Sequence, residues 1–408
     1  MPPEKPGKRM PAAEGRGVNR PADASLFIGG LFAQLLRRAG VNERTLERLR
    51  VALVFALPLI AWLPLLVLTG VNGTLLPGRV GAPFMLDLSA HLRLLVALPL
   101  FLFAGVVASA RLLPTLQQFT IRGLVPDASR ERFEAAITSA FRLGNSAVAD
   151  VVILILIYSV DTLVVRRNHD AFASTTWLFR ALGPGATPTP AATWYAIVSL
   201  PIFEFVLLRW YYRLVIWARF LAQVAKLRLR LVPTNPDRMG GLGFLLLGTQ
   251  AFAVFAMAHG ALLAGWLSTR VLVRDMPLTE FKLEIAAVVV FVLCITILPL
   301  LFFTVPLMRT KRRGVLEYGA LATRYAREFD DKWVRSKDAG EPLVGSADVQ
   351  SLADMGGSYD LVRSMRNVPV TFEMVLEFAG LTLVPVAPLL LTLMPLSEIL
   401  NKLVGILF

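Results

Sequence analysis

Long apolar runs separated by shorter polar segments dominate the chain from residue 51 onwards. A helix needs about 20 predominantly apolar residues to cross the roughly 30 Å hydrocarbon core of a bilayer. Seven runs approach or exceed that length, at residues 51–70, 92–110, 147–165, 193–218, 242–268, 283–307 and 374–395. The pattern therefore predicts an all-α fold, a polytopic helical membrane bundle of about seven transmembrane helices.

The remaining segments differ from these runs in composition. Residues 1–24 are rich in Pro, Gly and basic side chains, which is typical of a disordered tail. Residues 25–41 place Leu26, Phe27, Leu31, Leu35 and Leu36 near one helical face, which indicates an interfacial amphipathic helix before a bundle at 42–307. In the external loop 166–192, Trp177 and Phe179 are expected at the membrane interface.

The largest polar segment spans residues 308–373 and predicts a small cytoplasmic helical element. Its first part continues the sixth run and carries one apolar stripe, formed by Tyr318, Leu321, Tyr325, Phe329 and Trp333. Two short helices are expected after it, at about 347–355 and 358–367. Residues 374–408 then hold the last transmembrane helix, kinked by its prolines, and an amphipathic C-terminal tail.

The net positive charge of the chain is explained mostly by where its Lys and Arg residues lie. A net charge of +13 on a soluble chain would favour nucleic-acid binding. Here 31 of the 42 Lys and Arg residues lie in segments 1–50, 111–146, 219–241 and 308–373, against nine on the opposite side. Cytoplasmic loops concentrate Lys and Arg, so this bias predicts a cytoplasmic N-terminus and argues against nucleic acid as a partner. One cysteine, Cys294, and three histidines leave no disulfide framework, metal site or cofactor to predict.

Four ionisable residues inside the apolar runs form the first candidate site. A charge in hydrocarbon is costly and points to a function by default. Asp150 and Asp161 lie eleven residues apart, close to one face of the third run, while Glu204 and His259 lie near the middle of the fourth and fifth. They predict a polar transport path. The alternative is that each is satisfied separately: Asp150 at the inner interface, Glu204 by an arginine, and His259 by a backbone carbonyl.

Two arginines of the fourth run, Arg209 and Arg213, share a face near its inner end, with aromatic neighbours. We expect them to extend to the headgroups, the alternative being a role in anion binding or gating.

The second candidate site lies in the segment KLRLRLVPTNPDRMGGLGFL, residues 226–245. A glycine-rich loop before a helix can present backbone amides to an anion, although no nucleotide-binding spacing is present. The candidate residues of this inner-face gate or ligand site are Asn235, Asp237, Arg238, Gly240, Gly241 and Gly243. The alternative is a rigid turn in which glycine permits close packing.

A third stretch, GSADVQSLAD at residues 345–354, contributes Asp348, Gln350 and Asp354. On the predicted topology it lies on the same side as the basic loop 226–238, so we expect these side chains to reach that loop. The specific expectation is an ion pair between Asp348 and Arg238.

The motif PTNPDRMGGLGFL, together with GSADVQSLADM and the preceding Lys332 and Trp333, resembles a family of uncharacterised bacterial multi-pass inner-membrane proteins. That family usually has histidine where Asn235 stands here, so a titrating or metal-binding role at that position does not carry over. The resemblance implies a bacterial inner membrane and no particular activity.

Taken together, these patterns favour translocation of a small ion or solute by a channel or transporter. The alternative is a sensor or assembly scaffold whose segment 308–373 binds a protein partner or anionic lipid at the basic inner face. A membrane enzyme is the third reading, weakened by the lack of His and Cys on the inner side, and no catalytic residue is predicted. The expected partners are the lipid bilayer, anionic lipid, and a protein partner or a second copy of the chain.

Overall fold

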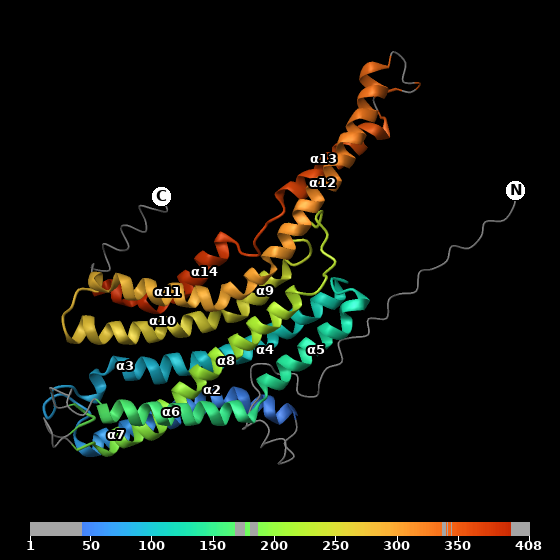
Figure 1. Cartoon of the computed structure of the whole chain (residues 1–408). Coiled ribbons are helices and arrows are strands. Elements are labelled where there is room, and N and C mark those ends of the chain that lie inside the picture. Colours follow the sequence, from blue (N-terminus) through green and yellow to red (C-terminus); the bar gives the residue numbers. More distant parts are fainter. Residues whose placement is uncertain are drawn as a thin grey trace.

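The chain forms an elongated bundle of helices in a computed structural model that describes residues 43–167, 176–179, 187–336, 340, 342–343 and 345–392 (Figure 1). Within that part, the only β-pairing consists of two isolated bridges, Ala82 with Thr176 and Phe179 with Pro188. The predicted all-α fold is confirmed. The predicted N-terminal tail, the interfacial helix at 25–41 and the amphipathic C-terminal tail lie outside the described residues.

Six helical stretches of the described chain are long and apolar enough to cross a membrane. They are α2 (Glu43–Asn72), α3–η2–α4 (Leu88–Ile121), α7–η3–α8 (Pro190–Ala225), α9–η4–α10–η5 (Phe244–Val273), η6–α11–η7–α12–η8 (Leu278–Arg335) and α14–η9 (Phe372–Thr392). A seventh results when α5 (Asp127–Gly144) and α6 (Ala147–Arg167), bent by 43° at their junction, count as one span. The predicted number of about seven agrees with this upper count.

Helix α10 (Ala253–Ser268) forms the centre of the bundle. In the apolar window of its span, 72% of the residues are buried inside the protein, against 22–39% in the other five spans. Small residues let its neighbours approach closely: Gly260 lies against the backbone of Thr382 in α14 (Phe372–Leu383), and Gly265 against Ser89. Close backbone approach at small residues is how helices associate in lipid, where the hydrophobic effect between helices is weak.

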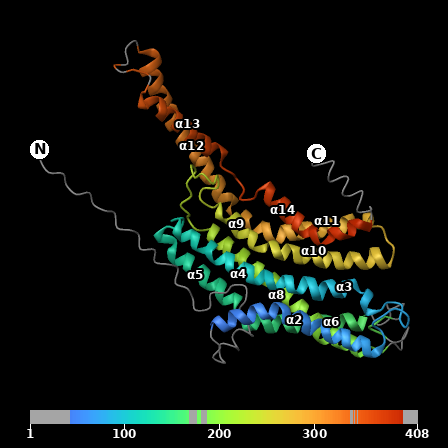
Figure 2. The same cartoon turned by 180° about the vertical axis from the view of Figure 1, so that it is seen from behind.

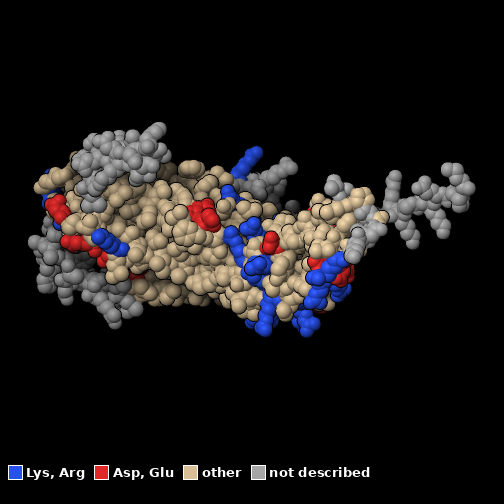
Figure 3. All heavy atoms as spheres, turned by 90° about the horizontal axis from the view of Figure 1, so that it is seen from above, with Lys and Arg blue, Asp and Glu red and all other residues tan. Residues whose placement is uncertain are grey.

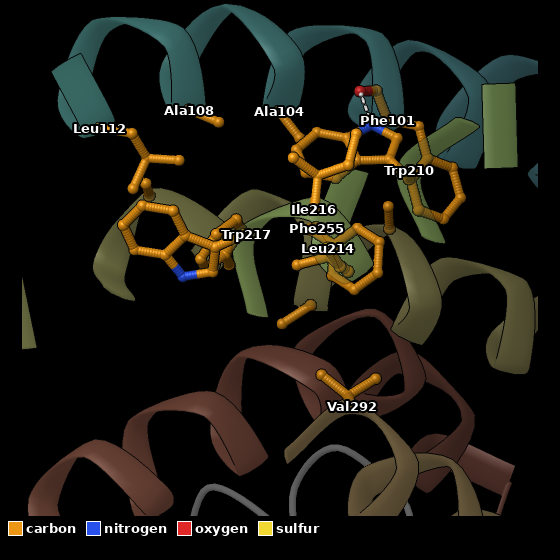
Figure 4. Close-up of a cluster of buried hydrophobic side chains, with 14 of the residues drawn as sticks. Phe101, Ala104, Ala108, Leu112, Trp210, Leu214, Ile216, Trp217, Phe255 and Val292 are labelled. Carbon is orange, nitrogen blue, oxygen red and sulfur yellow. Dashed lines mark hydrogen bonds between the residues drawn. The ribbon is translucent and has the colours of Figure 1, made fainter. Parts of the chain in front are cut away.

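The core beside α10 combines aromatic and aliphatic side chains, and Trp210 of α8 (Leu200–Ala225) lies next to Phe101 within it (Figure 4). The Trp210 indole donates a hydrogen bond of 2.8 Å to the carbonyl oxygen of Phe101, and its ring lies 5.1 Å from that of Phe255. This side chain therefore joins α4 (Leu98–Ile121), α8 and α10 by one polar and several apolar contacts.

Helix α5 occupies part of a segment that the sequence treats as an inner loop. Its buried residues recur at spacings of three and four along one face, and they are Phe133, Ala136, Ile137, Ala140, Phe141 and Gly144. Its other face carries charged residues such as Arg130 and Glu134, which are paired with each other. This amphipathic pattern packs α5 against α8 at one end of the bundle.

A helical hairpin of α12 (Thr304–Phe329) and α13 (Ala347–Ser364) projects from that same end, which we call the hairpin side (Figures 1 and 2). The first arm continues without interruption from α11 (Lys282–Ile297), as predicted. The expectation of two short helices after residue 345 is wrong, because one helix runs through Gly356 and Gly357. Charged side chains are sparse over most of the bundle in this view, whereas Lys and Arg gather where the hairpin leaves it (Figure 3).

The last described span changes geometry at its prolines. Helix α14 ends at Leu383, and η9 (Val384–Thr392) continues as a 3-10 helix through Pro385 and Pro388. A proline cannot donate to the preceding turn, which accounts for the change. At the far end of the bundle, Trp177 is 2% exposed and packs on Phe84 and Tyr195, so its ring lies inside the protein and not on its surface.

We expect Gly260→Ala to destabilise the protein. A Cβ atom there would overlap the carbonyl oxygen of Thr382, a backbone atom that moves only with α14. Overpacking of this kind costs about 1–3 kcal/mol. The matched control is Gly380→Ala in α14, where nothing lies within 4 Å of the added carbon. Thermal unfolding in detergent should show a lower midpoint for Gly260→Ala alone, and equal midpoints for both variants would contradict the close contact.

Candidate functional site

The four predicted path residues fall into three separate arrangements. Asp150 on α6 forms an ion pair with Arg209 on α8, and both side chains are at most 5% exposed. Arg209 also donates a hydrogen bond of 2.9 Å to the carbonyl oxygen of Gly144, the last residue of α5. Neither Arg209 nor Arg213 extends to the headgroups, because both are buried. The two charges therefore neutralise each other, and Arg209 holds the end of α5 and the start of α6 against α8.

His259 is held by two hydrogen bonds within the core. Its Nδ1 lies 3.0 Å from the carbonyl oxygen of Phe255, and its Nε2 lies 2.9 Å from the hydroxyl of Tyr211. A neutral imidazole satisfies both contacts, donating from Nδ1 and accepting at Nε2. The rings of Phe101, Phe255 and Phe291 surround it. These contacts match the alternative reading of a histidine bonded to a backbone carbonyl.

Asp161 and Glu204 are brought together. Their side chains, on α6 and α8, are hydrogen-bonded to each other. Glu204 and Tyr211, the partner of His259, lie seven residues apart, or about 10 Å along α8. The hydrogen bonds of His259 go to Tyr211 and Phe255, and neither goes to the carboxyl pair.

Arg93 and Tyr195, which the sequence analysis did not identify, lie beside this pair. We call Asp161, Glu204, Arg93 and Tyr195 together the carboxyl cluster. Arg93 lies in η2 (Leu92–Ala97), and its guanidinium donates a 2.5 Å hydrogen bond to the hydroxyl of Tyr195 in η3 (Tyr195–Ser199). The same guanidinium interacts electrostatically with Glu204. The only sequence signal for Arg93 was a basic residue at the edge of an apolar run.

The carboxyl cluster approaches the end of the bundle opposite the hairpin. Asp87, the N-cap of α3 (Leu88–His91), interacts electrostatically with Tyr195 and accepts a 3.0 Å hydrogen bond from the indole of Trp177. Trp177 in turn packs edge-on against the Tyr195 ring. Ionisable groups therefore follow one another from Asp87 through Tyr195 and Arg93 to Glu204 and Asp161.

A hydrogen bond between two carboxyl groups needs one proton between them, because two carboxylates offer only acceptors. The second carboxyl can then carry the negative charge that Arg93 balances. The arrangement can hold, release and regain a proton. In the described chain, no group of three or more His, Cys, Asp and Glu side chains is placed to hold a metal ion.

Residues 235–243, which we call the glycine motif, bind a carboxylate that belongs to the motif itself. The Asp237 carboxylate accepts hydrogen bonds from the backbone amides of Met239, Gly241 and Gly243, at 2.8, 3.1 and 2.8 Å. Gly240 and Gly241 have positive φ values of 64° and 102°, a conformation that glycine adopts without strain. The amides that the sequence offered to a ligand are thus engaged by Asp237.

The same motif anchors the base of the hairpin. The carbonyl oxygen of Arg238 accepts a 2.7 Å hydrogen bond from the amide of Arg366, just beyond α13. Gly314 of α12 leaves no room for a Cβ atom beside Pro233. Asn235 stabilises the turn by accepting from the Asp237 amide at 3.2 Å. These contacts support the rigid-turn interpretation.

Asp348 lies at the tip of the hairpin, and its expected pairing with Arg238 is wrong. Its carboxylate accepts hydrogen bonds from Lys332 at 2.6 Å and from the Trp333 indole at 3.1 Å. Arg238 contacts Arg366, which follows the other end of α13, about 25 Å away along the helix. Gln350 and Asp354 are bonded to each other at 2.9 Å, so this motif closes the hairpin tip.

Comparison with protein-family models, with curated proteins and with solved structures finds no match to this chain.

Replacing one partner of the buried ion pair should lower the free energy of unfolding more than replacing both partners. Arg209→Met leaves the Asp150 charge buried without its partner, which costs about 3–5 kcal/mol. Adding Asp150→Leu removes that charge, so the double variant should be more stable than Arg209→Met. Denaturant unfolding in detergent measures this, with exposed Arg219→Met on the same helix as the control. Additive losses in the double variant would contradict a coupled pair.

Asp348 should stabilise the hairpin tip at neutral pH and lose this effect in acid. Hydrogen bonds from Lys332 and Trp333 lower the pKa of Asp348 below its ordinary value of 3.8. A lowered pKa in the folded state adds stability above the ordinary value, and this is lost as pH falls through the lowered pKa. At pH 7, Asp348→Asn should speed amide exchange at the start of α13.

The control for this variant is Asp360→Asn, on the exposed surface of the same helix. In acid below the lowered pKa, the wild type and Asp348→Asn should exchange alike once intrinsic rates are corrected. A difference that persists unchanged there would show that the Asp348 charge is not its cause.

Proposed function

We propose that this integral membrane protein translocates protons through the carboxyl cluster. The observation that carries the proposal is the hydrogen bond between Asp161 and Glu204, two carboxyl side chains on neighbouring membrane helices. Intramembrane carboxyls that pair with each other are typical of proton relays in pumps and transporters. Of the four path residues predicted from the sequence, the proposal keeps Asp161 and Glu204 and adds Arg93 and Tyr195.

A proton fits this cluster better than a metal cation. The carboxyl–carboxyl hydrogen bond already requires a shared proton. The Arg93 guanidinium, which acts on Glu204, would repel a metal cation seated between the carboxylates. A cation of this kind would also need further oxygen ligands beyond one carboxyl pair.

The proposal includes an orientation. The excess of Lys and Arg on the hairpin side supports a cytoplasmic hairpin and a cytoplasmic N-terminus. Asp87 and Trp177 then lie on the external side, from which a proton would enter. The resemblance of the two motifs supports a bacterial inner membrane as the location.

The second candidate is a scaffold or sensor that uses the hairpin to hold a protein partner. Exposed apolar side chains along the hairpin favour it, among them Leu316 at 68%, Val334 at 69% and Leu321 at 46% exposed. In that case the carboxyl cluster would only fasten α6 to α8.

Reconstituted protein in liposomes under imposed proton, potassium and sodium gradients distinguishes the two. We expect a proton flux that Glu204→Gln and Asp161→Asn reduce by about 100-fold or more, as loss of a proton-transfer group does. The control is Glu284→Gln, an exposed carboxyl at the start of α11. Gel filtration and thermal unfolding would first establish that all variants are folded.

Proton flux that is unchanged in Glu204→Gln would exclude the carboxyl cluster as the path. The absence of any flux in folded, inserted protein would reject translocation of these ions. Potassium or sodium flux that depends on Glu204 would retain the site and replace the proton as the transported species.

A further inference from the structure

Basic and apolar side chains alternate in the segment that follows α8. Lys226, Arg228 and Arg230 are exposed, whereas the three leucines between and after them, Leu227, Leu229 and Leu231, are partly buried against the core. The segment is thus attached to the bundle by its leucines, and its three positive charges point away from it.

The backbone of this segment is held in place by neighbouring parts of the bundle. The amide of Arg230 donates a 2.8 Å hydrogen bond to the carbonyl oxygen of Leu124, and the amide of Val232 donates one of 3.2 Å to that of Gly240. A fixed backbone presents the three basic side chains in a set order, and less conformational entropy is lost when they bind.

A second basic group lies beside the first. Arg309 and Arg312 are exposed in the first turns of α12, directly after buried Leu307. The contact between Gly314 and Pro233 places this part of α12 next to the segment 226–232. We call Lys226, Arg228, Arg230, Arg309 and Arg312 the basic band, and Figure 3 shows Lys and Arg gathered between the bundle and the hairpin.

The basic band carries an excess of positive charge. Across the described ranges, none of its five side chains forms a salt bridge. Nearby Arg313 is excluded from it because Glu317 pairs with Arg313 at 2.7 Å. Asp237, the acidic residue of the adjoining motif, is occupied by three backbone amides.

The band lies where the apolar surface of the bundle ends. Its first member follows directly on α8, whose apolar length crosses the membrane, and its last follows the apolar span of α11 and η7 (Leu298–Phe303). Basic residues at this depth meet the phosphates of lipid headgroups, and anionic lipids attract them more strongly than zwitterionic ones.

We propose that the basic band binds the headgroups of anionic lipids in the surrounding leaflet. The site takes a phosphate-bearing headgroup with a net negative charge, and the alternating leucines keep the segment on the bundle while the charges reach outward. This proposal is independent of proton translocation, because it concerns the lipids around the bundle on the hairpin side.

Lipid binding to the full-length protein in detergent tests it. Phosphatidylglycerol or phosphatidylcholine with identical acyl chains would be titrated, and bound lipids counted by native mass spectrometry. We expect tighter binding of phosphatidylglycerol, weakened as salt is raised because exposed charges are screened. The variant Lys226→Gln/Arg228→Gln/Arg230→Gln should bind phosphatidylglycerol about 10- to 100-fold more weakly.

The matched control removes three charges elsewhere, as Arg324→Gln/Arg327→Gln/Arg335→Gln on the hairpin, and should bind like the wild type. Inorganic phosphate is the second probe. If it displaces phosphatidylglycerol at similar concentration, the site is one for free phosphate and the lipid proposal is overturned. Equal affinity for both lipids, or equal loss in both triple variants, would overturn it as well.

Discussion

A charged side chain in hydrocarbon must find its partner within the protein, and this requirement determines how α6 is held. Helix α6 is apolar around most of its circumference, and many of its residues are exposed to the surroundings of the bundle. Three of its described polar side chains reach the same neighbouring span, η3–α8: Asp150 pairs with Arg209, Tyr158 donates to the carbonyl oxygen of Ile197, and Asp161 bonds to Glu204. These contacts give α6 a direction and a depth that apolar packing against lipid would leave open.

The contact of Arg209 extends this constraint beyond α6. Because its guanidinium also binds the carbonyl oxygen of Gly144, the end of α5 and the start of α6 are tied to the same side chain of α8. Tyr212, one turn further along, donates to the carbonyl oxygen of Leu143 at 3.0 Å. At the 43° bend between α5 and α6, side chains of α8 therefore satisfy the last carbonyl oxygens of α5, as a buried helix end requires.

Local patterns predicted the spans well because the length of an apolar run follows directly from bilayer thickness. They also predicted that Asp150 and Asp161 share a helical face. They did not reveal which helix that face meets, since packing depends on the whole bundle. For the same reason Arg93 was overlooked as a partner of Glu204, and Asp348 was assigned to Arg238 although Lys332 and Trp333 lie nearer in sequence and in space.

The glycine motif has a pattern typical of ligand binding, but in this fold it connects two parts of the protein. Its amides converge on a negative charge, as in an anion site, but the charge is the Asp237 carboxylate of the motif itself. Asp237 thus satisfies those amide donors, and carbonyl oxygens of the loop accept hydrogen bonds from other parts of the protein. Arg122 donates to the Gly241 carbonyl oxygen, and the amide of Arg366 donates to that of Arg238. The loop therefore connects the end of α4 to the base of the hairpin.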